Sequence, residues 1–357
     1  MIRDPIAPPF RTSLAAALYC LAVGLILVLP LALRALHAPA HRSRIATVPL
    51  SAGGSSFLQQ EVFDETSDLD MLVVGDSVDW NALDTVEIRK ALSQAIGRDA
   101  RVVSLGWYFT GEDMLYYVLR DLLAHRKVAH VVLRLQPEDQ NRQSSHPQAY
   151  RWLFGCEHDP VIPTLRLIDK LQAYGVQAIG GPRNLLSVVR SDLLMPSWEA
   201  PTLGHFAVVQ QLSGPFRPID LPVPQLPLDA LMVDAINSSQ RMRPIAFPVR
   251  GFQQQYAVAV RDLLRSYGVP VTLLRVPTRS EARAHTLPVS GGQLALYGND
   301  VRLVVPDAGQ LFAGVGDSDL DGFYYYDERH LNRNGSRYFT LAVMPALVEI
   351  QRDLHGR

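Results

Sequence analysis

Cysteine is scarce in this sequence: among 357 residues there are only two, Cys20 and Cys156. Two cysteines, one of them inside an apolar run, exclude a disulfide framework. His158 and Asp159 follow Cys156 closely, a grouping that a Cys/His nucleophile or a metal cluster would use, but no second pair of ligands accompanies it. We therefore expect an ordinary thiol there, and we expect neither a metal nor any other cofactor.

The sequence also lacks an excess of charge of either sign. It has 34 Lys and Arg against 35 Asp and Glu, a formal net charge of -1, whereas proteins that bind nucleic acid usually carry a basic surface. No segment interleaves aromatic residues with Lys or Arg in the manner of a base-stacking surface. Nucleic acid is thus not an expected partner. The 48% of hydrophobic and 19% of charged residues indicate a globular chain.

Charge is missing altogether from residues 13–33, a run that arginines flank on both sides. Such a run is long enough to cross a membrane as a helix, although its flanking arginines do not orient it. A cleaved signal peptide is the alternative, with Ala-Pro-Ala at residues 38–40 as its cleavage site, but the run exceeds the usual apolar length of about 7–15 residues. We expect a transmembrane anchor in residues 1–35, followed by a linker in residues 36–65.

After the linker, patterns typical of buried strands alternate with patterns typical of amphipathic helices. Helical spacing of apolar residues predicts the first helix at residues 81–97. Apolar runs predict five strands, at residues 69–75, 101–106, 128–135, 270–276 and 301–306. Alternating strands and helices predict one α/β domain over residues 66–357, with a doubly wound, flavodoxin-like parallel sheet of about five strands.

The alternation is lost between about residues 141 and 248. Five prolines crowd residues 215–227 and prevent a regular element there. We interpret this segment as a long insertion on the functional edge of the sheet. It also contains Trp152 and Trp198.

The tripeptide Gly-Asp-Ser occurs twice, ending at Ser77 and at Ser318. Ser77 closes the first predicted strand, and the ligand sites of open parallel sheets lie beyond the carboxyl ends of their strands. Gly75 permits a tight turn there, where backbone N–H groups can face a developing oxyanion. Ser77 is therefore the candidate nucleophile, and an ordinary turn is the alternative.

Ser318 belongs to a different pattern. Residues 317–328 fit the template of an EF-hand calcium loop, with four acidic ligand positions at Asp317, Asp319, Asp321 and Glu328. An EF-hand also needs a helix on each side, whereas glycines interrupt the segment before this one and the segment after it. We expect a solvated acidic turn rather than a calcium site.

A serine hydroxyl needs an imidazole to take its proton and usually a carboxylate to orient that imidazole. Asp327 and His330 follow the last predicted strand at a three-residue spacing. With Ser77 directly after the first strand, this order resembles the SGNH/GDSL hydrolase superfamily. The resemblance implies that Ser77 is the nucleophile, His330 the general base and acid, and Asp327 its orienting partner.

The resemblance also implies an oxyanion hole, but one motif departs from the family. Ser77 and Gly106 match the first two backbone donors. The family's third donor is an asparagine that is absent from the corresponding motif here, where Gln136 is the candidate replacement. Losing one donor costs about 2.7–4 kcal/mol of transition-state stabilisation, so we expect slow hydrolysis of simple esters.

An anchored domain of this kind looks similar to the membrane-tethered proteins that work with membrane-bound O-acyltransferases in the O-acetylation of exopolysaccharides such as alginate. That similarity implies a single-pass protein of the inner membrane, with its N-terminus (within residues 1–35) in the cytoplasm and its catalytic domain in the periplasm. The domain would pass an acyl group from Ser77 to a polysaccharide hydroxyl. Two alternatives stay open. One is an esterase or deacetylase that uses the same triad with water, and the other is an inactive module that binds glycan or a membrane partner.

Overall fold

The computed structural model describes the chain in segments. They are residues 12–35, 60–107, 111–136, 144–146, 149, 161–175, 219, 221–232, 251–289, 291–297, 301–324 and 328–356. Most of the predicted linker and most of the predicted insertion, with Cys156, Trp152 and Trp198, lie outside these residues. Our interpretation of those two segments stays a prediction.

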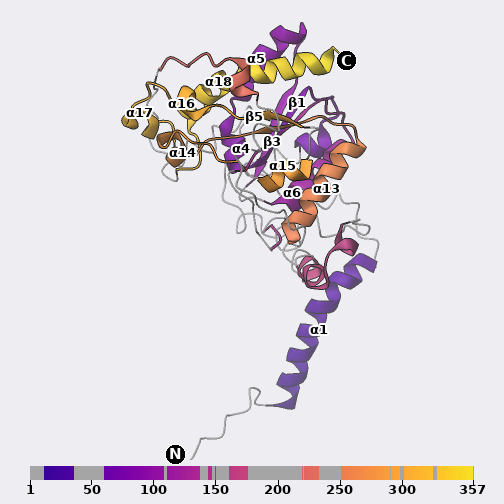
Figure 1. Cartoon of the computed structure of the whole chain (residues 1–357). Coiled ribbons are helices and arrows are strands. Elements are labelled where there is room, and N and C mark those ends of the chain that lie inside the picture. The colour runs from indigo at the N-terminus through magenta and orange to yellow at the C-terminus, as the bar shows by residue number, and fades with distance from the viewer. Residues whose placement is uncertain are drawn as a thin grey trace, which may run out of the picture.

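A five-stranded parallel sheet forms the centre of the fold (Figure 1). Its strands follow the flavodoxin-like order β2-β1-β3-β4-β5. They are β1 (Met71–Asp76), β2 (Val102–Trp107), β3 (Val131–Arg134), β4 (Val271–Leu274) and β5 (Arg302–Val304). Their apolar side chains are buried, as expected for a parallel sheet that helices cover on both faces. The predicted α/β fold with five parallel strands is confirmed.

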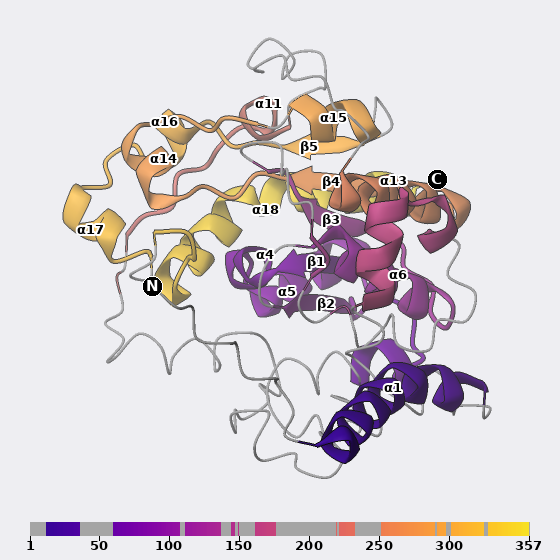
Figure 2. The ribbon, with the colours of Figure 1, turned by 90° about the horizontal axis from the view of Figure 1, so that it is seen from below.

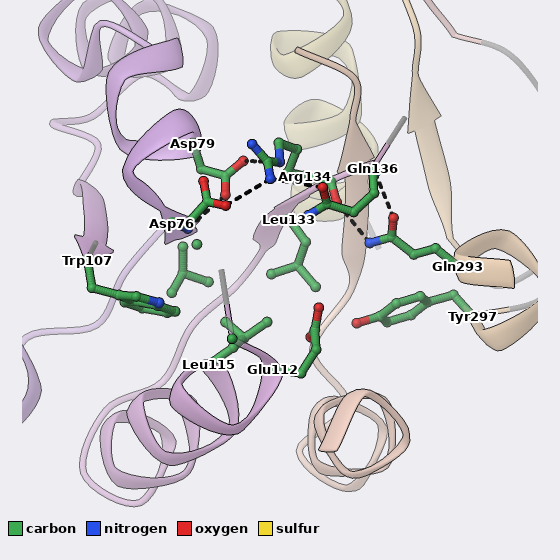
Figure 3. Close-up of a pocket in the computed structure, with 13 residues that line it drawn as sticks. Asp76, Asp79, Trp107, Glu112, Leu115, Leu133, Arg134, Gln136, Gln293 and Tyr297 are labelled. Atoms are coloured by element: carbon green, nitrogen blue, oxygen red, sulfur yellow. Dashed lines mark hydrogen bonds and ion pairs between the residues drawn. The ribbon is translucent and has the colours of Figure 1, made fainter. Parts of the chain in front are cut away.

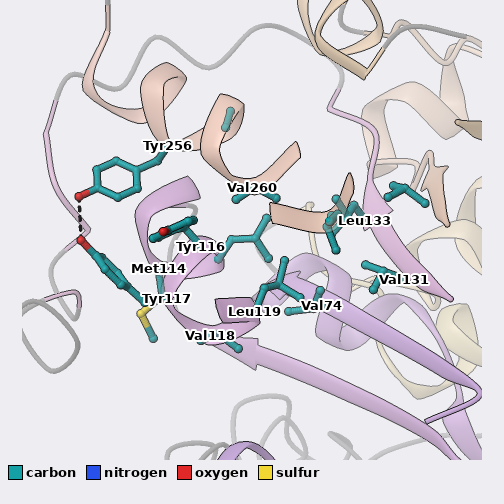
Figure 4. Packing of buried hydrophobic residues seen from close by; sticks show 14 of the residues in the cluster. Val74, Met114, Tyr116, Tyr117, Val118, Leu119, Val131, Leu133, Tyr256 and Val260 are labelled. Carbon is teal, nitrogen blue, oxygen red and sulfur yellow. Dashed lines mark hydrogen bonds between the residues drawn. The ribbon is translucent and has the colours of Figure 1, made fainter. Parts of the chain in front are cut away.

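Two apolar layers cover the sheet. One contains α6 (Glu112–Leu123), α13 (Phe252–Ser266) and α15 (Gly291–Tyr297), and the other contains α5 (Thr85–Ile96) and α18 (Arg333–His355) (Figure 2). In the first layer Tyr116 and Tyr117 of α6 pack against Tyr256 of α13. The hydroxyls of Tyr117 and Tyr256 lie 2.8 Å apart, so this buried pair satisfies its own polar groups (Figure 4).

Shorter helices connect these elements. They are η1 (Gln60–Asp64), α4 (Ser77–Ala82), η2 (Ile162–Thr164), α11 (Leu228–Leu231), α14 (Arg279–Arg283), α16 (Ala308–Leu311) and α17 (Asp317–Asp321). The helix predicted after β1 is divided: α4 ends before Leu83, which is extended, and Asp84 begins α5 by accepting hydrogen bonds from the N–H groups of Val86 and Glu87. The division leaves Ser77 on a short turn of its own at the end of β1.

Helix α1 (Ser13–Ala35) covers the predicted anchor and points away from the α/β domain (Figure 1). Its exposed apolar side chains include Leu14, Leu18, Leu21 and Val28. Over the residues described, none of the helices combines the length and the apolar character that a membrane span requires. Within α1 the described side chains are those of residues 13–25 and 28, and the transmembrane assignment stays a prediction.

Candidate active site

The junction between β1 and α4 holds Ser77 at the carboxyl edge of the sheet. Asp76 caps α4: its carboxylate accepts a hydrogen bond from the N–H of Val78 at 2.8 Å, while the carboxylate of Asp79 accepts one from the N–H of Asp76 at 2.9 Å. Glycine is needed at position 75, because a Cβ there would lie 1.9 Å from Asp79 Oδ2. Ser77 is the first helical residue, so its own N–H has no acceptor within the helix.

The imidazole of His330 reaches Ser77 from the other end of the chain. Ser77 Oγ and His330 Nε2 lie 2.8 Å apart, a hydrogen-bonding distance, although 253 positions separate the two residues. Both residues are partly exposed, so a substrate could approach them. The predicted proximity of Ser77 and His330 is confirmed. Asp327, the third predicted member of the triad, lies outside the described residues.

Contacts on both sides of His330 hold its loop in place. Glu328 has a left-handed backbone, with φ of 62°, which is costly for a residue that carries a side chain. Arg279 stabilises this turn: its N–H donates to Glu328 O at 2.8 Å, and its Nη2 donates to Glu328 Oε1 at 2.6 Å. On the other side, Asn332 caps α18, and its side-chain amide donates to the carbonyl of Gly322 at 2.7 Å.

The residues that fit the calcium-loop template begin with a helix instead of a loop. Their first five positions form α17, on which Ser318 is exposed. Asp321 pairs with Arg283 at 2.5 Å and with Arg279 at 3.5 Å, and Glu328 pairs with Arg279. In the described part of the chain, no group of three or more His, Cys, Asp or Glu residues is arranged to hold a metal ion. The acidic side chains Asp321 and Glu328 thus support the His330 loop through arginine.

The two remaining oxyanion candidates lie on neighbouring strands. Gly106 lies inside β2, and a Cβ there would be 2.4 Å from Trp80 Cβ, so this glycine lets α4 pack onto the sheet. Gln136 follows β3: its Oε1 accepts a hydrogen bond from Arg134 Nη2, and its N–H donates to Gln293 Oε1, both at 2.8 Å. A donor role for Gly106 or Gln136 toward an oxyanion stays a prediction.

A pocket lies next to the β1–α4 junction, at the carboxyl ends of β1, β2 and β3 (Figure 3). Its cation is Arg134, a residue that our reading of the sequence did not single out. Arg134 Nη2 donates to Asp76 Oδ2 at 2.8 Å, and Arg134 Nε lies 3.6 Å from Asp79 Oδ1. A lone charged residue at the end of an apolar strand is the signal that could have revealed it, since a buried charge needs a partner.

Burial and charge shift the titration of this pocket. Burial raises the pKa of Asp79 to about 8; Arg134 opposes the shift and Asp76 adds to it. Burial also raises the pKa of Glu112 to about 7, and the charges of Asp113 and Asp76 add to that shift. Burial disfavours the charge of Arg134, but the surrounding carboxylates outweigh it and raise the pKa of Arg134. At pH 7 Asp79 therefore retains its proton, whereas Glu112 is divided between its protonated and its ionised form.

The sequence matches no protein-family model and no curated protein. The resemblance to SGNH hydrolases accordingly stays a prediction.

We expect the Arg279→Met substitution to loosen the His330 loop, because Glu328 then loses the bond from Arg279 Nη2, and of the two bonds from residue 279 only that of the backbone N–H still supports its costly conformation. The N–H of Asn332, which donates to Phe323 O, is the probe. Its hydrogen exchange, measured by NMR, should accelerate about tenfold, which corresponds to about 1.4 kcal/mol. In the double variant Arg279→Met/Glu328→Gly the exchange of the Asn332 amide should be slower than in Arg279→Met alone, since glycine adopts the left-handed region freely.

Arg261→Met is the matched control for this loop, since Arg261 lies on α13 and pairs with the exposed Asp262. It should leave the exchange of the Asn332 amide unchanged. Equal exchange rates in wild type and Arg279→Met would contradict the assigned role of Arg279.

The raised pKa of Asp79 predicts a pH-dependent stability. Between about pH 4 and pH 8 the folded state holds a proton on Asp79 that the unfolded state releases, so the free energy of unfolding should fall as pH rises through this window. One proton corresponds to at most about 1.4 kcal/mol per pH unit. Asp79→Asn should remove this contribution, which urea unfolding at pH 5, 6, 7 and 8 would measure.

Asp317→Asn, on the exposed side of α17, is the control and should parallel wild type. If the Asp79→Asn and wild-type stabilities differ by the same amount at every pH, the raised pKa is wrong.

Proposed function

We propose that this protein is a serine acyl-transfer enzyme in which Ser77 is the nucleophile and His330 the general base and acid. The supporting observation is the 2.8 Å distance between Ser77 Oγ and His330 Nε2. An imidazole at this distance can accept the hydroxyl proton as the serine oxygen attacks, which a serine alone cannot do efficiently at neutral pH.

The first half-reaction transfers an acyl group to the enzyme. Ser77 Oγ attacks the carbonyl carbon of an acyl donor, its proton passes to His330 Nε2, and the carbonyl oxygen becomes an oxyanion. The bond to the leaving oxygen then breaks, the leaving oxygen takes the proton from His330, and an ester of Ser77 remains. Asp327 would orient His330, and the N–H groups of Ser77 and Gly106 with the amide of Gln136 would bind the oxyanion.

The second half-reaction passes the acyl group to an acceptor hydroxyl. The acceptor oxygen attacks the ester carbonyl while His330 takes its proton, and collapse of the intermediate returns that proton to Ser77 Oγ. We propose that a sugar hydroxyl of a polysaccharide outside the cytoplasm is this acceptor, as the resemblance to exopolysaccharide O-acetylation proteins implies. A membrane-bound O-acyltransferase would then supply the acyl group.

The test follows the acyl group in the full-length protein, purified in detergent. With p-nitrophenyl acetate, wild type should show slow release of acetate and an acetyl group on the Ser77 peptide by mass spectrometry. Ser77→Ala should remove both, and His330→Ala should lower the rate by at least about 10³-fold. Ser318→Ala changes the other Gly-Asp-Ser and is the matched control: it should behave as wild type.

Adding an oligosaccharide separates transfer from hydrolysis. Acetylated sugar should form faster than free acetate. If acetate dominates at every sugar concentration, the protein is an esterase. If Ser77→Ala changes neither product while the sugar still binds, the domain is a non-catalytic binding module and the proposal fails.

We further propose that α1 anchors the domain in the inner membrane as a single span, with the domain of residues 66–357 in the periplasm. The support is the charge-free run from residue 13 to residue 33 and the exposed leucines of α1. A C-terminal alkaline phosphatase fusion should be active, and a C-terminal green fluorescent protein fusion exported by the same route should be dark. Release of the protein from membranes by carbonate would contradict the anchor, and the opposite reporter pattern would contradict the orientation.

A further inference from the structure

The pocket beside the β1–α4 junction lies where open α/β sheets bind their ligands. β2 and β3 flank β1 on opposite sides. The chain therefore crosses the sheet in one direction from β1 to β2 and in the opposite direction from β2 to β3. Ligands bind beyond the carboxyl ends of the strands at such a switch point. Gly75 and Asp76 of β1 line the pocket together with Leu133 and Arg134 of β3. The pocket is therefore adjacent to Ser77 but distinct from the Ser77–His330 pair.

One wall of the pocket presents a hydrogen-bond donor that the described residues leave unused. Trp107 is 4% exposed, lines the pocket, and has no hydrogen-bond partner for Nε1 within the described ranges. Figure 3 shows its indole extending toward the centre of the pocket. A buried donor left unpaired costs about 1–3 kcal/mol, so a group bound here would be favoured if it could accept a hydrogen bond.

The opposite wall presents groups that can accept a hydrogen bond. The carboxyl group of Glu112 and the hydroxyl of Tyr297 both point into the pocket from α6 and α15 (Figure 3). Arg134 also lines the pocket: its Nη2 donates to Asp76, whereas its Nε, 3.6 Å from Asp79 Oδ1, has no hydrogen-bond partner among the described residues. A ligand thus meets a fixed donor at Trp107, a cation held beside Asp76 and Asp79, an acidic group at Glu112, and a tyrosine that can donate or accept.

These groups discriminate between ligand chemistries. A carboxylate or phosphate could accept from Trp107 but would place its negative charge beside the carboxylate of Asp76 and beside Glu112, which is mostly ionised above pH 7. An ammonium could donate to Glu112 but would leave Trp107 unpaired and would lie near Arg134. A neutral hydroxyl matches both walls, because it accepts one hydrogen bond and donates another.

The size of the pocket limits the group further. Its cavity volume of about 30 Å³ holds about two water-sized groups. That is room for one hydroxyl and the carbon that bears it, and not for a whole sugar ring. The rest of a larger ligand would have to extend out of the pocket.

We propose that this pocket is the acceptor subsite, which takes one hydroxyl-bearing carbon of a neutral saccharide and selects against uronic acids. The subsite rests on the proposed acyl transfer from Ser77 and specifies its substrate class. Trp107 and Glu112 bind the hydroxyl, and the same residues select against a carboxylate at that position of the sugar.

The test uses two acceptors that differ only at C6: cellohexaose and its C6-oxidised uronate. The full-length protein is acetylated with p-nitrophenyl acetate, and the ratio of acetylated sugar to free acetate is measured. This ratio is independent of the rate at which Ser77 is acetylated. Wild type should give a ratio at least about tenfold higher with cellohexaose than with the uronate.

Trp107→Phe keeps the ring and removes the N–H, and Glu112→Gln keeps the shape and removes the acidic group. Each should lower the ratio of acetylated sugar to free acetate for cellohexaose about tenfold. Glu112→Gln should also reduce the difference in this ratio between cellohexaose and the uronate. Glu349→Gln, near the end of α18, is the control and should match wild type. Circular dichroism and thermal melting check folding, and if Trp107→Phe fails to fold, Glu112→Gln decides.

A binding experiment separates the subsite from the reaction. Calorimetric titration of Ser77→Ala with cellohexaose should show binding that Trp107→Phe weakens about tenfold. If Ser77 is never acetylated but this binding is seen, the acyl-transfer proposal fails and the neutral-sugar site stands. If Ser77 is acetylated but neither variant changes the ratio, or the uronate is used equally well, the acceptor subsite is overturned.

Discussion

The position of Ser77 depends on one buried cation. Arg134, at the end of β3, binds Asp76 and lies close to Asp79, and these two carboxylates are the reciprocal caps of the turn that presents Ser77. Removing one partner from a buried ion pair costs about 3–5 kcal/mol, because the other charge is left uncompensated. The strand next to β1 therefore helps to fix the geometry of Ser77, the proposed nucleophile. Replacing Asp79 by a larger side chain or Gly75 by any other residue would disturb this arrangement directly.

The base is held by a second, independent set of contacts. Arg279 stabilises the left-handed turn at Glu328, and Asn332 joins the start of α18 to the carbonyl of Gly322. The bond between Ser77 Oγ and His330 Nε2 joins the two sets directly. Each partner is thus positioned by its own framework, and the packing of α18 onto α4 and α5 brings the two frameworks together.

Much of the fold and part of the candidate site could be predicted from the sequence, for physical reasons. Strands buried on both faces of a parallel sheet are apolar along their whole length, and the helices between them carry apolar residues at helical spacing. The five strands were therefore predictable. The proximity of Ser77 and His330 followed from their places after the first and last strands. Arg134 stands out in the sequence only as a lone charge at the end of an apolar strand. Asp79 and Trp107 were not predictable as site residues, because their importance comes from burial beside partners far away in the sequence. The division between α4 and α5 was missed because Asp84 looks, in sequence, like an ordinary surface residue of one longer helix.

The separation of 253 positions between Ser77 and His330 also has a consequence in time. A ribosome adds about 5–20 residues per second, so roughly 13–50 s pass between synthesis of the serine and synthesis of its base. During that interval the nascent chain carries the proposed nucleophile without the imidazole that we propose as its base. A chain released before residue 330 would lack that imidazole even if its first three strands had already formed. Synthesis from the N-terminus thus delays assembly of the proposed pair until residue 330 has been added.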